Sequence, residues 1–446
     1  MEKENVLITG KIGPSLLKFA IPFLAASLLQ ALYGAADLFF VGQYSDSSAV
    51  SAVAIGSQVM QTITGIILGI STGATVIIGR HIGEKDFDGA AKTIGTTAVL
   101  FIILSIIITP IMVLLTGRIV SIMDTPPEAA IPARNYILTC SLGIPFIVGY
   151  NAVSGIFRGI GDSKTPVYFI LLACIINIVM DYILTAIIPL SAEGAAIATV
   201  MAQGISFIAS LLYLKKKGLG FKFTRSHISF NKGLSLMILK VGAPLALQDA
   251  FVNMSFLVIT AIVNSLGIVA SASVGVVEKI VVFAMLPPTA FASAVAAMTA
   301  QNVGAGKTDR ARKVLWYGVS YSLIFGVIAC LLGQFTPQSL TSLFSNDPQV
   351  IASAAQYLKS YSLDCLFVSF VFCMNSYFSG FGKSIIAFAH SMVATFIIRI
   401  PLTYILSKAA GGSLYIIGFA APCATAVSLI ICLYFINAKK DMFLLK

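Results

Sequence analysis

Long apolar runs separated by short polar connectors dominate this chain from Leu16 to about residue 436. A run of about 20 apolar residues crosses a bilayer as a helix, because each backbone polar group must find its partner within its own segment. The pattern predicts an all-α integral membrane protein with twelve transmembrane helices. The expected ranges are 14–40, 49–72, 91–115, 133–157, 165–188, 193–214, 234–263, 268–298, 315–335, 351–378, 384–407 and 413–436.

Two of the polar connectors, 221 residues apart, have similar sequences. They are Gly79–Lys92 and Ala300–Lys313, and the same offset relates Phe157–Gly161 to Phe378–Gly382. Self-similarity at a fixed offset indicates two copies of one membrane unit. Each copy holds six spans, an even number, so both copies enter the membrane from the same side. We therefore expect two six-helix bundles related by a pseudo-two-fold axis along the membrane normal.

The longest polar connector, at about residues 215–232, separates the sixth span from the seventh and carries six Lys or Arg residues. It divides an expected N-terminal lobe, 1–218, from a C-terminal lobe, 219–446. All but seven of the 29 Lys and Arg residues fall in the tails, this connector and alternate loops. The seven exceptions are Lys18, Arg118, Arg134, Lys279, Lys359, Arg399 and Lys408. This asymmetry predicts a plasma-membrane protein with both termini in the cytoplasm.

Composition narrows the function classes. Apolar residues make up 58% of the chain and charged residues 11%, about half the usual share of charge, so lipid must solvate most of the surface. The net charge of +11 lies in short loops, as in membrane proteins, and nucleic acid is not an expected partner. The seven cysteines occur singly and the three histidines lack ligand spacing, so we expect no cofactor and no structural metal.

Ionisable groups at membrane depth are costly, and each is therefore a functional candidate. Asp37 lies late in the first span, and Asp181 lies in the outer part of the fifth span, four residues after Asn177. A spacing of four places Asn177 and Asp181 on one helix face, where both can point into one pocket. Carboxylate and amide oxygens can hold a proton or coordinate sodium. A cap at the helix end is the alternative for Asp37, and a structural acid is the alternative for Asp181.

The second copy does not repeat these acids but has a polar set of its own. Its members are Gln248, Asp249, Asn253, Glu278, Asp364 and Arg399, which are candidates for the substrate cavity or for secondary coupling. Gln248 and Asp249 lie on adjacent faces, so at most one is expected to point inward. We expect Glu278 to pair with the neighbouring Lys279, and Arg399 to need a carboxylate partner. The spans and connectors repeat in the second copy, but the acids Asp37 and Asp181 do not. We therefore expect the first copy alone to hold the ion site.

Two prolines hold corresponding places in the repeat. Pro22 lies in the first span and Pro244 in the seventh. Proline removes a backbone donor and kinks a helix. Membrane helices tolerate proline, but the matched pair favours a shared bend, and Pro22 is therefore a candidate hinge.

Four features together resemble the multidrug and toxic compound extrusion (MATE) family of efflux transporters, within the multidrug/oligosaccharidyl-lipid/polysaccharide flippase superfamily. They are Pro22 with the Asp37 segment, the loop Arg80–Lys92, the segment Asn151–Lys164, and Asn177–Asp181 followed by Glu193–Thr199. The resemblance covers essentially the whole chain. It implies a V-shaped pair of lobes that opens alternately to either side. It also implies the export of cationic, amphipathic drugs or metabolites in exchange for protons or sodium.

The resemblance also implies a cation site in the first lobe. The matching positions are Asp37, Asn177, Asp181 and Thr199, with Asn151 nearby, and sodium would bind at the first three. Bending near Pro22 would couple the ion to the substrate. Other subgroups use acids in spans seven and ten, where Asp249 and Asp364 lie without a clear alignment. The expected working unit is a monomer in membrane lipid, and the choice between proton and sodium stays open.

Four other functions fit less well. A flippase for lipid-linked oligosaccharides would need a cationic cavity, and Arg399 is the only arginine well inside a span. A major-facilitator transporter would carry an Asp-Arg-x-Gly-Arg core in the loop at Gly79–Lys92, which this chain lacks. An intramembrane enzyme is not expected, because the chain has no pair of neighbouring histidines and no HExxH sequence. Nothing resembles a channel filter or a ring of repeated charges.

Overall fold

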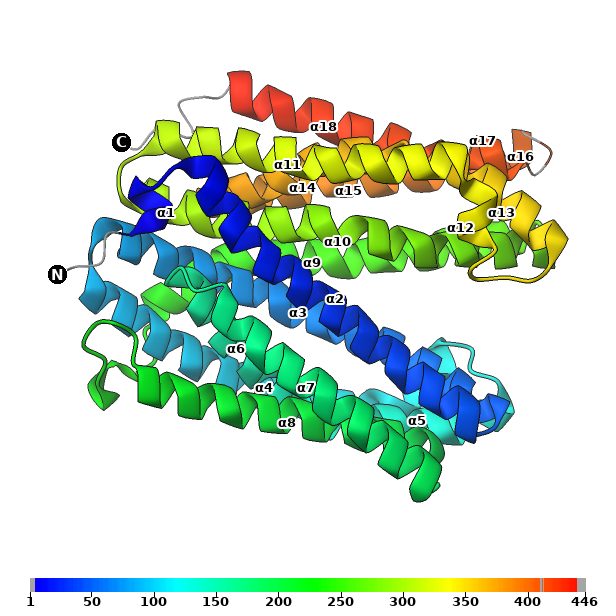
Figure 1. Cartoon of the computed structure of the whole chain (residues 1–446), viewed down its shortest axis with the longest axis horizontal. Helices are drawn as coiled ribbons and strands as arrows, with labels where there is room; N and C mark the ends of the chain where they lie inside the picture. Colours follow the sequence, from blue (N-terminus) through cyan, green and yellow to red (C-terminus); the bar gives the residue numbers. More distant parts are fainter. Residues whose placement is uncertain (1–4, 410, 412, 439–446) are drawn as a thin grey trace. The chain divides into compact units, whose positions relative to one another are not determined.

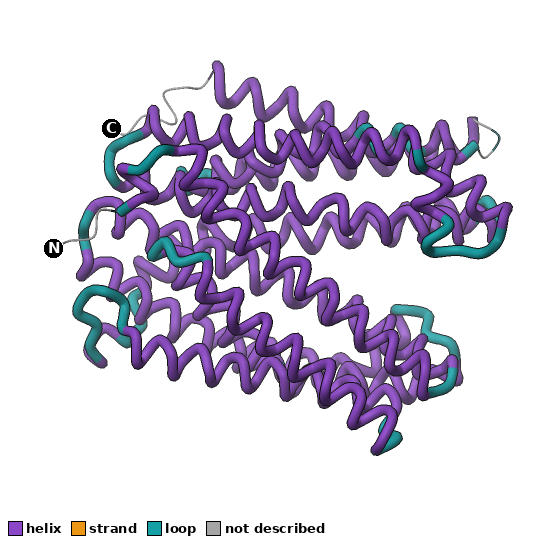
Figure 2. Tube along the Cα trace, viewed as in Figure 1, coloured by secondary structure: helices purple, strands orange, loops and turns teal. Residues whose placement is uncertain are grey.

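The computed structural model describes residues 5–409, 411 and 413–438, which form helices joined by loops, with no strand among them (Figures 1 and 2). Ten of the helices in this part of the chain are long and apolar enough to cross a membrane. Two further pairs of bent helices bring the number to twelve if each pair counts as one span. The expected all-α membrane fold is confirmed.

The first copy of the repeat contains eight α-helices, one π-helix and one 3₁₀-helix among the described residues. They are α1 (Val6–Thr9), α2 (Ile12–Tyr44), α3 (Ser47–Glu84), α4 (Phe87–Ile122), α5 (Pro127–Leu142), α6 (Ile144–Gly159), α7 (Lys164–Asp181), the π-helix η1 (Tyr182–Ile187), α8 (Ser191–Lys217) and the 3₁₀-helix η2 (Arg225–His227). The fourth expected span, 133–157, is in fact part of the pair α5 and α6, bent by 48°. Pro145 near the start of α6 explains the break, because proline cannot continue the hydrogen bonding of α5.

The second copy follows the same plan. Its helices are α9 (Lys232–Asn264), α10 (Ile268–Gly304), α11 (Thr308–Phe335), α12 (Pro337–Thr341), α13 (Pro348–Tyr361), α14 (Asp364–Gly380), α15 (Ser384–Met392), the π-helix η3 (Val393–Arg399), α16 (Ile400–Ala409), α17 (Leu414–Ile417) and α18 (Ala420–Ala438). The pair α13 and α14 is also bent by 48°. This break holds no proline. Gln334 Nε2 and Ser362 Oγ instead donate to the carbonyl of Lys359 at the end of α13.

The chain divides into two compact units. Unit 1 consists of Met1–Leu24 and Leu247–Lys446, and unit 2 of Ala25–Ala246. This division differs from the one expected at residue 218, because two long helices pass from one unit to the other. Helix α2 changes unit after Leu24 and α9 after Ala246. Each change follows closely on a proline inside the helix, Pro22 in α2 and Pro244 in α9.

In unit 2, the first part of α9 packs closely against α3. A Cβ atom at Gly73 of α3 would overlap with the carbonyl oxygen of Ile238, and one at Gly69 would meet the backbone of Ala246. Only a residue without a side chain permits this approach. Gly69 and Gly73, four residues apart on α3, therefore hold the first part of α9, a helix that ends in unit 1.

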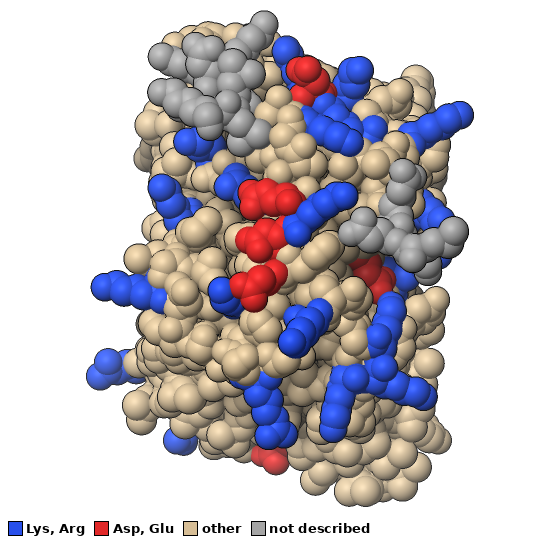
Figure 3. All heavy atoms as spheres, turned by 90° about the vertical axis from the view of Figure 1, so that its left-hand side faces the viewer, with Lys and Arg blue, Asp and Glu red and all other residues tan. Residues whose placement is uncertain are grey.

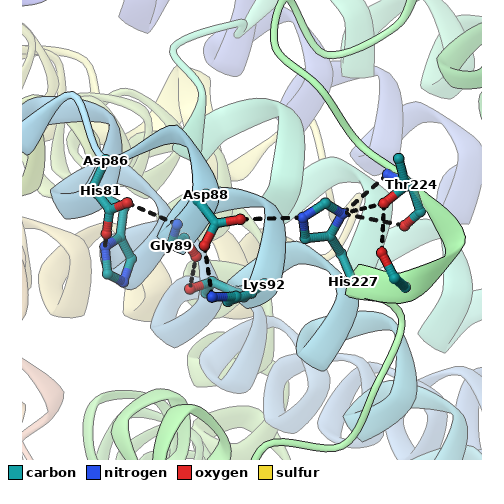
Figure 4. Close-up of polar contacts among 9 residues, drawn as sticks. His81, Asp86, Asp88, Gly89, Lys92, Thr224 and His227 are labelled. Atoms are coloured by element: carbon teal, nitrogen blue, oxygen red, sulfur yellow. Dashed lines mark hydrogen bonds and ion pairs between the residues drawn. The ribbon is translucent and has the colours of Figure 1, made fainter.

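Also in unit 2, the connector that precedes α9 docks on the first part of α4, where the first repeated connector ends (Figure 4). His227 Nε2 lies 3.3 Å from Asp88 Oδ1. Thr96 Oγ1 donates to the carbonyl of Ser229 at 3.3 Å, and the ring of Phe221 stacks on that of Phe87, 5.7 Å between centroids. A Cβ at Gly95 would overlap with the carbonyl oxygen of His227, so the connector lies directly against α4.

In unit 1, the second repeated connector holds the segment that precedes α2. Asn5 Nδ2 donates to Gln301 Oε1 at 3.0 Å, and Asn302 Nδ2 donates to the carbonyl of Leu7 at 3.1 Å. Lys307 Nζ and Arg310 Nη2 donate to the carbonyls of Ile8 and Gly10, respectively. The two repeated connectors thus share one structural role. Each anchors the chain just before a helix that changes unit.

A polar contact closes the loop between α6 and α7. Lys217 Nζ lies 2.8 Å from Asp162 Oδ2, and Thr165 Oγ1 donates to the same oxygen at 2.6 Å. Partial burial raises the pKa of Asp162, but the hydrogen bonds from Lys217 and Thr165 outweigh it and hold the pKa below its ordinary value. The carboxylate therefore ties the end of α8 to this loop.

Candidate functional site

Asp37 lies inside unit 2, on the part of α2 that follows the change of unit. Helix α2 continues to Tyr44, and Asp37 is only 2% exposed. The alternative of a cap at the helix end is therefore wrong. A buried carboxyl group needs partners in its surroundings, because an isolated charge in an apolar medium is very costly.

Two neighbouring helices supply partners for Asp37. Asn177 of α7 donates from Nδ2 to Asp37 Oδ1 at 2.9 Å. Thr199 of α8 donates from Oγ1 to Asp37 Oδ2 at 3.2 Å. The structure thus brings three of the expected residues together, and each oxygen of Asp37 accepts one hydrogen bond.

Asp181 completes the group. It is the last residue of α7, it is fully buried, and its carboxyl group interacts directly with that of Asp37. The π-helix η1 begins at the next residue, and Thr185 of η1 donates from Oγ1 to the carbonyl of Asp181 at 2.6 Å. π-Helical turns are rare and often lie at functional sites. Here the turn follows the acidic residue directly.

The group contains more acceptors than donors. Asn177 Oδ1, Asp181 Oδ1 and Asp181 Oδ2 are buried and have no hydrogen-bond donor among the described residues. Buried acceptors normally have a donor, and each exception requires an explanation. The described contacts of Asp37 and Asp181 include no Lys, Arg or His. Two buried carboxyl groups with open oxygens and no basic neighbour match the needs of a cation, either a proton or sodium.

Residues that were not expected from the sequence line the same group. The hydroxyl of Tyr33 is buried and has no hydrogen-bond partner in the described part of the chain, and its polar neighbours are Asp37, Thr199 and Gln203. Cys140 of α5 also lies near Asp37. The helical spacing could have found two of these residues, since Tyr33 precedes Asp37 by four positions and Gln203 follows Thr199 by four.

Asn151 lies outside this cluster. Its Nδ2 donates to the carbonyl of Ile147 in its own helix at 2.8 Å, and its carbonyl accepts from Ser71 Oγ at 2.7 Å. It makes no described hydrogen bond with the acids. Pro22 lies in the unit 1 part of α2, about 22 Å from Asp37 along the helix at 1.5 Å per residue.

One of the polar candidates in the second copy, Arg399, lies within electrostatic range of two others in unit 1. Arg399, at the end of η3, interacts electrostatically with Glu278 of α10 and Asp364 of α14. The expected pairing of Glu278 with Lys279 is wrong, because consecutive residues on a helix point about 100° apart. Asp364 is 5% exposed, and its Oδ1 has no donor among the described residues.

The other three candidates lie along α9. Gln248 is partly buried, with its Oε1 lacking a donor in the described part of the chain. Asp249 and Asn253 are exposed on the helix surface. None of the three has a described hydrogen bond with the Arg399 group.

Comparison with known proteins agrees with this fold. A family model described as MatE matches residues 22–183 and again residues 244–405. The chain belongs to the MatE (MATE) family of membrane transporters. The two matches begin at Pro22 and Pro244, so each copy of the repeat matches the family model separately.

Relatives within this family differ in what they are named for. The chain is 29% identical over 400 residues to "Probable multidrug resistance protein YpnP" of Bacillus subtilis (strain 168), covering 89% of both chains. It is 27% identical to the "FAD transporter" of Shewanella oneidensis, covering 80% of both. The solved structure of a MOP superfamily transporter from Pyrococcus furiosus superposes with a TM-score of 0.94 at 20% identity over the whole of both chains. This structural likeness confirms the MATE fold.

Proposed function

We propose that this MATE transporter exports cationic, amphipathic drugs or metabolites in exchange for a proton or sodium bound between Asp37 and Asp181. One observation carries the proposal, namely the buried pair of carboxyl groups, in which both oxygens of Asp181 and the neighbouring amide oxygen of Asn177 lack a donor among the described residues. Asn177 and Thr199 hold Asp37 in place, so the pair is formed before the ion arrives.

Exchange follows from charge balance. With the ion bound, the excess negative charge of the pair is reduced. When the ion is absent, the negative charge of the pair favours binding of a cationic substrate in the same lobe. A transporter that accepts the ion from outside and the substrate from inside then couples the two flows, because each ligand favours a different conformation. Pro22 and Pro244 lie where α2 and α9 change unit, and bending there would allow one unit to move while its first helix stays anchored.

The proposed orientation places the repeated connectors in the cytoplasm. In Figure 3, the faces turned to the viewer carry more basic than acidic side chains. Cytoplasmic loops have this excess of Lys and Arg. Because the ion site lies within unit 2 alone, a single chain supplies it, and we propose the monomer as the working unit in the plasma membrane.

The proposed substrate class rests on composition. The chain has 30 Phe, 15 Tyr and 13 Met residues, and few fixed positive charges inside its spans. Aromatic and thioether side chains suit flat organic cations. Since one relative is named for FAD, a flavin belongs in the substrate panel beside cationic dyes.

Transport in inverted membrane vesicles tests the proposal. An imposed pH gradient and an imposed sodium gradient are applied separately, and uptake of a fluorescent cationic dye and of a flavin is followed. We expect one gradient to drive dye uptake, and Asp37→Asn and Asp181→Asn each to abolish it. Asp124→Asn is the matched control, because Asp124 is exposed at positive φ, which asparagine tolerates. Full gradient-driven uptake in both site variants would refute the ion site.

A further inference from the structure

The turn between α3 and α4, in the middle of the first repeated connector, brings three metal-ligating side chains together. His81 Nδ1 lies 3.0 Å from Asp86 Oδ2 and 3.6 Å from Glu84 Oε2, and the three ligand atoms all lie within 4.8 Å of one another. Two atoms that bind one zinc ion at about 2.1 Å in tetrahedral geometry lie about 3.4 Å apart. The two separations from His81 bracket this value, so small side-chain rotations place all three atoms on one ion.

The local fold fixes the three ligands. His81 and Glu84 are three residues apart at the end of α3 and therefore share a helix face. Lys85 adopts a left-handed φ of 60°, which ends α3 and reverses the chain. Asp86 then caps α4, and its Oδ1 accepts from the N–H of Gly89 at 2.9 Å. Because Oδ1 is held by the helix, Oδ2 is directed at His81 (Figure 4).

An open pocket of about 410 Å³ lies beside this turn, within unit 2. Its lining includes His81, Asp86 and Asp88 together with Asn231, Leu234 and Met237 around the start of α9. Lys92 also lines the pocket, and its Nζ lies 2.6 Å from Asp88 Oδ2, so Asp88 engages this positive charge. One histidine and two carboxylates leave a coordination position for water, and the pocket provides the space for it.

The corresponding turn of the second copy lacks all three ligands. At the offset of 221 residues, the positions of His81, Glu84 and Asp86 are taken by Asn302, Ala305 and Lys307. Helices α10 and α11 are nevertheless joined there by a short turn, between Gly304 and Thr308. The repeated turn therefore forms without these ligands, and folding alone does not explain why the first copy has them.

The nature of the ligands selects the class of ion. The sequence predicted no metal because the three histidines lack ligand spacing among themselves, but the partners of His81 are acids three and five residues further along the chain. Calcium and magnesium prefer oxygen ligands alone, whereas imidazole favours transition-metal ions such as zinc. Two carboxylates also balance the charge of a divalent ion.

We infer that the α3–α4 turn binds a divalent transition-metal ion, coordinated by His81 Nδ1, Glu84 and Asp86. None of these residues belongs to the ion site at Asp37 and Asp181, so the two proposals stand independently. In the proposed orientation, the metal site faces the cytoplasm. Binding stabilises the turn against which the connector before α9 is placed, because the ion binds only the folded arrangement of ligands.

Zinc binding to the purified full-length protein in lipid nanodiscs tests this inference. Any affinity tag is removed, and Zn²⁺ is titrated by calorimetry. The wild type should bind one Zn²⁺ ion at this site, and Asp86→Asn should weaken binding by about tenfold or more. Asparagine caps a helix as well as aspartate, so this variant keeps the start of α4. Asp46→Asn is the matched control, because Asp46 caps α3 through the N–H of Ala49, and it should bind zinc like the wild type.

Variants of neighbouring residues locate the ion. His81→Gln and Glu84→Gln should weaken binding as Asp86→Asn does. His227→Gln should leave it unchanged, although His227 lies 3.3 Å from Asp88 in the same region. If His81→Gln does not fold, Glu84→Gln decides with Asp86→Asn, because the Glu84 side chain is 49% exposed.

Four results would overturn the inference. They are no Zn²⁺ binding by the wild type, undiminished affinity in Asp86→Asn and Glu84→Gln, loss of binding in His227→Gln alone, and a thiolate charge-transfer band in the spectrum of the Co²⁺-loaded protein. The last would place the metal at a cysteine instead of the turn.

Discussion

Asn177 donates a hydrogen bond of 2.9 Å to Asp37, although 140 residues separate them in the chain. This bond joins α7 to α2 at the centre of the candidate ion site. Thr199 adds a second donor from α8. Three helices thus orient one buried carboxyl group, and an acid four residues along α7 shares its surroundings.

The hydroxyl of Thr199 provides the first prediction. Thr199→Val keeps the shape of the side chain but removes the donor to Asp37 Oδ2. A hydrogen bond to a charged group contributes about 1.5–3 kcal/mol, so ion-driven export should fall by about tenfold or more. Thr199→Ser keeps the hydroxyl and should retain most of the activity. Dye efflux from vesicles under a fixed gradient measures both, and equal rates in the two variants would argue against the hydrogen bond.

The site could be predicted in part because its residues follow helical spacing. Asn177 and Asp181 are four apart, which places them on one face without knowledge of the fold. Nothing in the spacing joins them to Asp37 or Thr199, and only the family resemblance did so. Tyr33 and Gln203 are not identified as site residues by the sequence, because aromatic and amide side chains are common in membrane helices. Both nevertheless lie one helical turn from a site residue.

The fold shows a similar limit. The twelve spans follow from hydropathy, but the division at residue 218 does not match the two units. Hydropathy records where the chain enters and leaves the membrane, and not which neighbours a long helix packs against. Packing of Gly69 and Gly73 against α9 keeps the start of α9 in unit 2. The repeated connectors were recognisable as a repeat, but their anchoring role depends on contacts between distant segments.

The docked connector in unit 2 provides the second prediction. Gly95→Ala would place a methyl group against the carbonyl of His227 and displace the connector. We expect a lower Tm and faster tryptic cleavage at Lys222 and Arg225, which lie in the exposed connector. The matched control is Gly117→Ala in the same helix, because nothing lies within 4 Å of a Cβ there. That variant should be unchanged or stabilised by up to about 1 kcal/mol.

Thermal unfolding and limited proteolysis of these two variants check the prediction. If Gly95→Ala and Gly117→Ala gave the same Tm and the same cleavage rate, the connector would not be held against α4 as the structure describes.

The Asp162–Lys217 contact provides a third prediction, on pH. The pKa of Asp162 is lowered on folding, so its carboxylate stabilises the folded state above its unfolded pKa of about 3.9, and this stabilisation is lost as pH falls through the folded value. Asp162→Asn should therefore lower the Tm by a constant amount between about pH 5 and about pH 8. The difference from the wild type should shrink at more acidic pH. A Tm difference that grew on acidification would contradict the assigned contact.

In the proposed mechanism, the ion and the substrate exclude each other through Asp37 and Asp181. Ion release on addition of a transported cationic dye to the purified protein tests it most directly, with protons followed in weakly buffered solution and sodium followed as ²²Na⁺. We expect release of one ion per chain from the wild type and from Asp124→Asn, and none from Asp37→Asn or Asp181→Asn. Undiminished release from both site variants, with dye affinity retained, would contradict it.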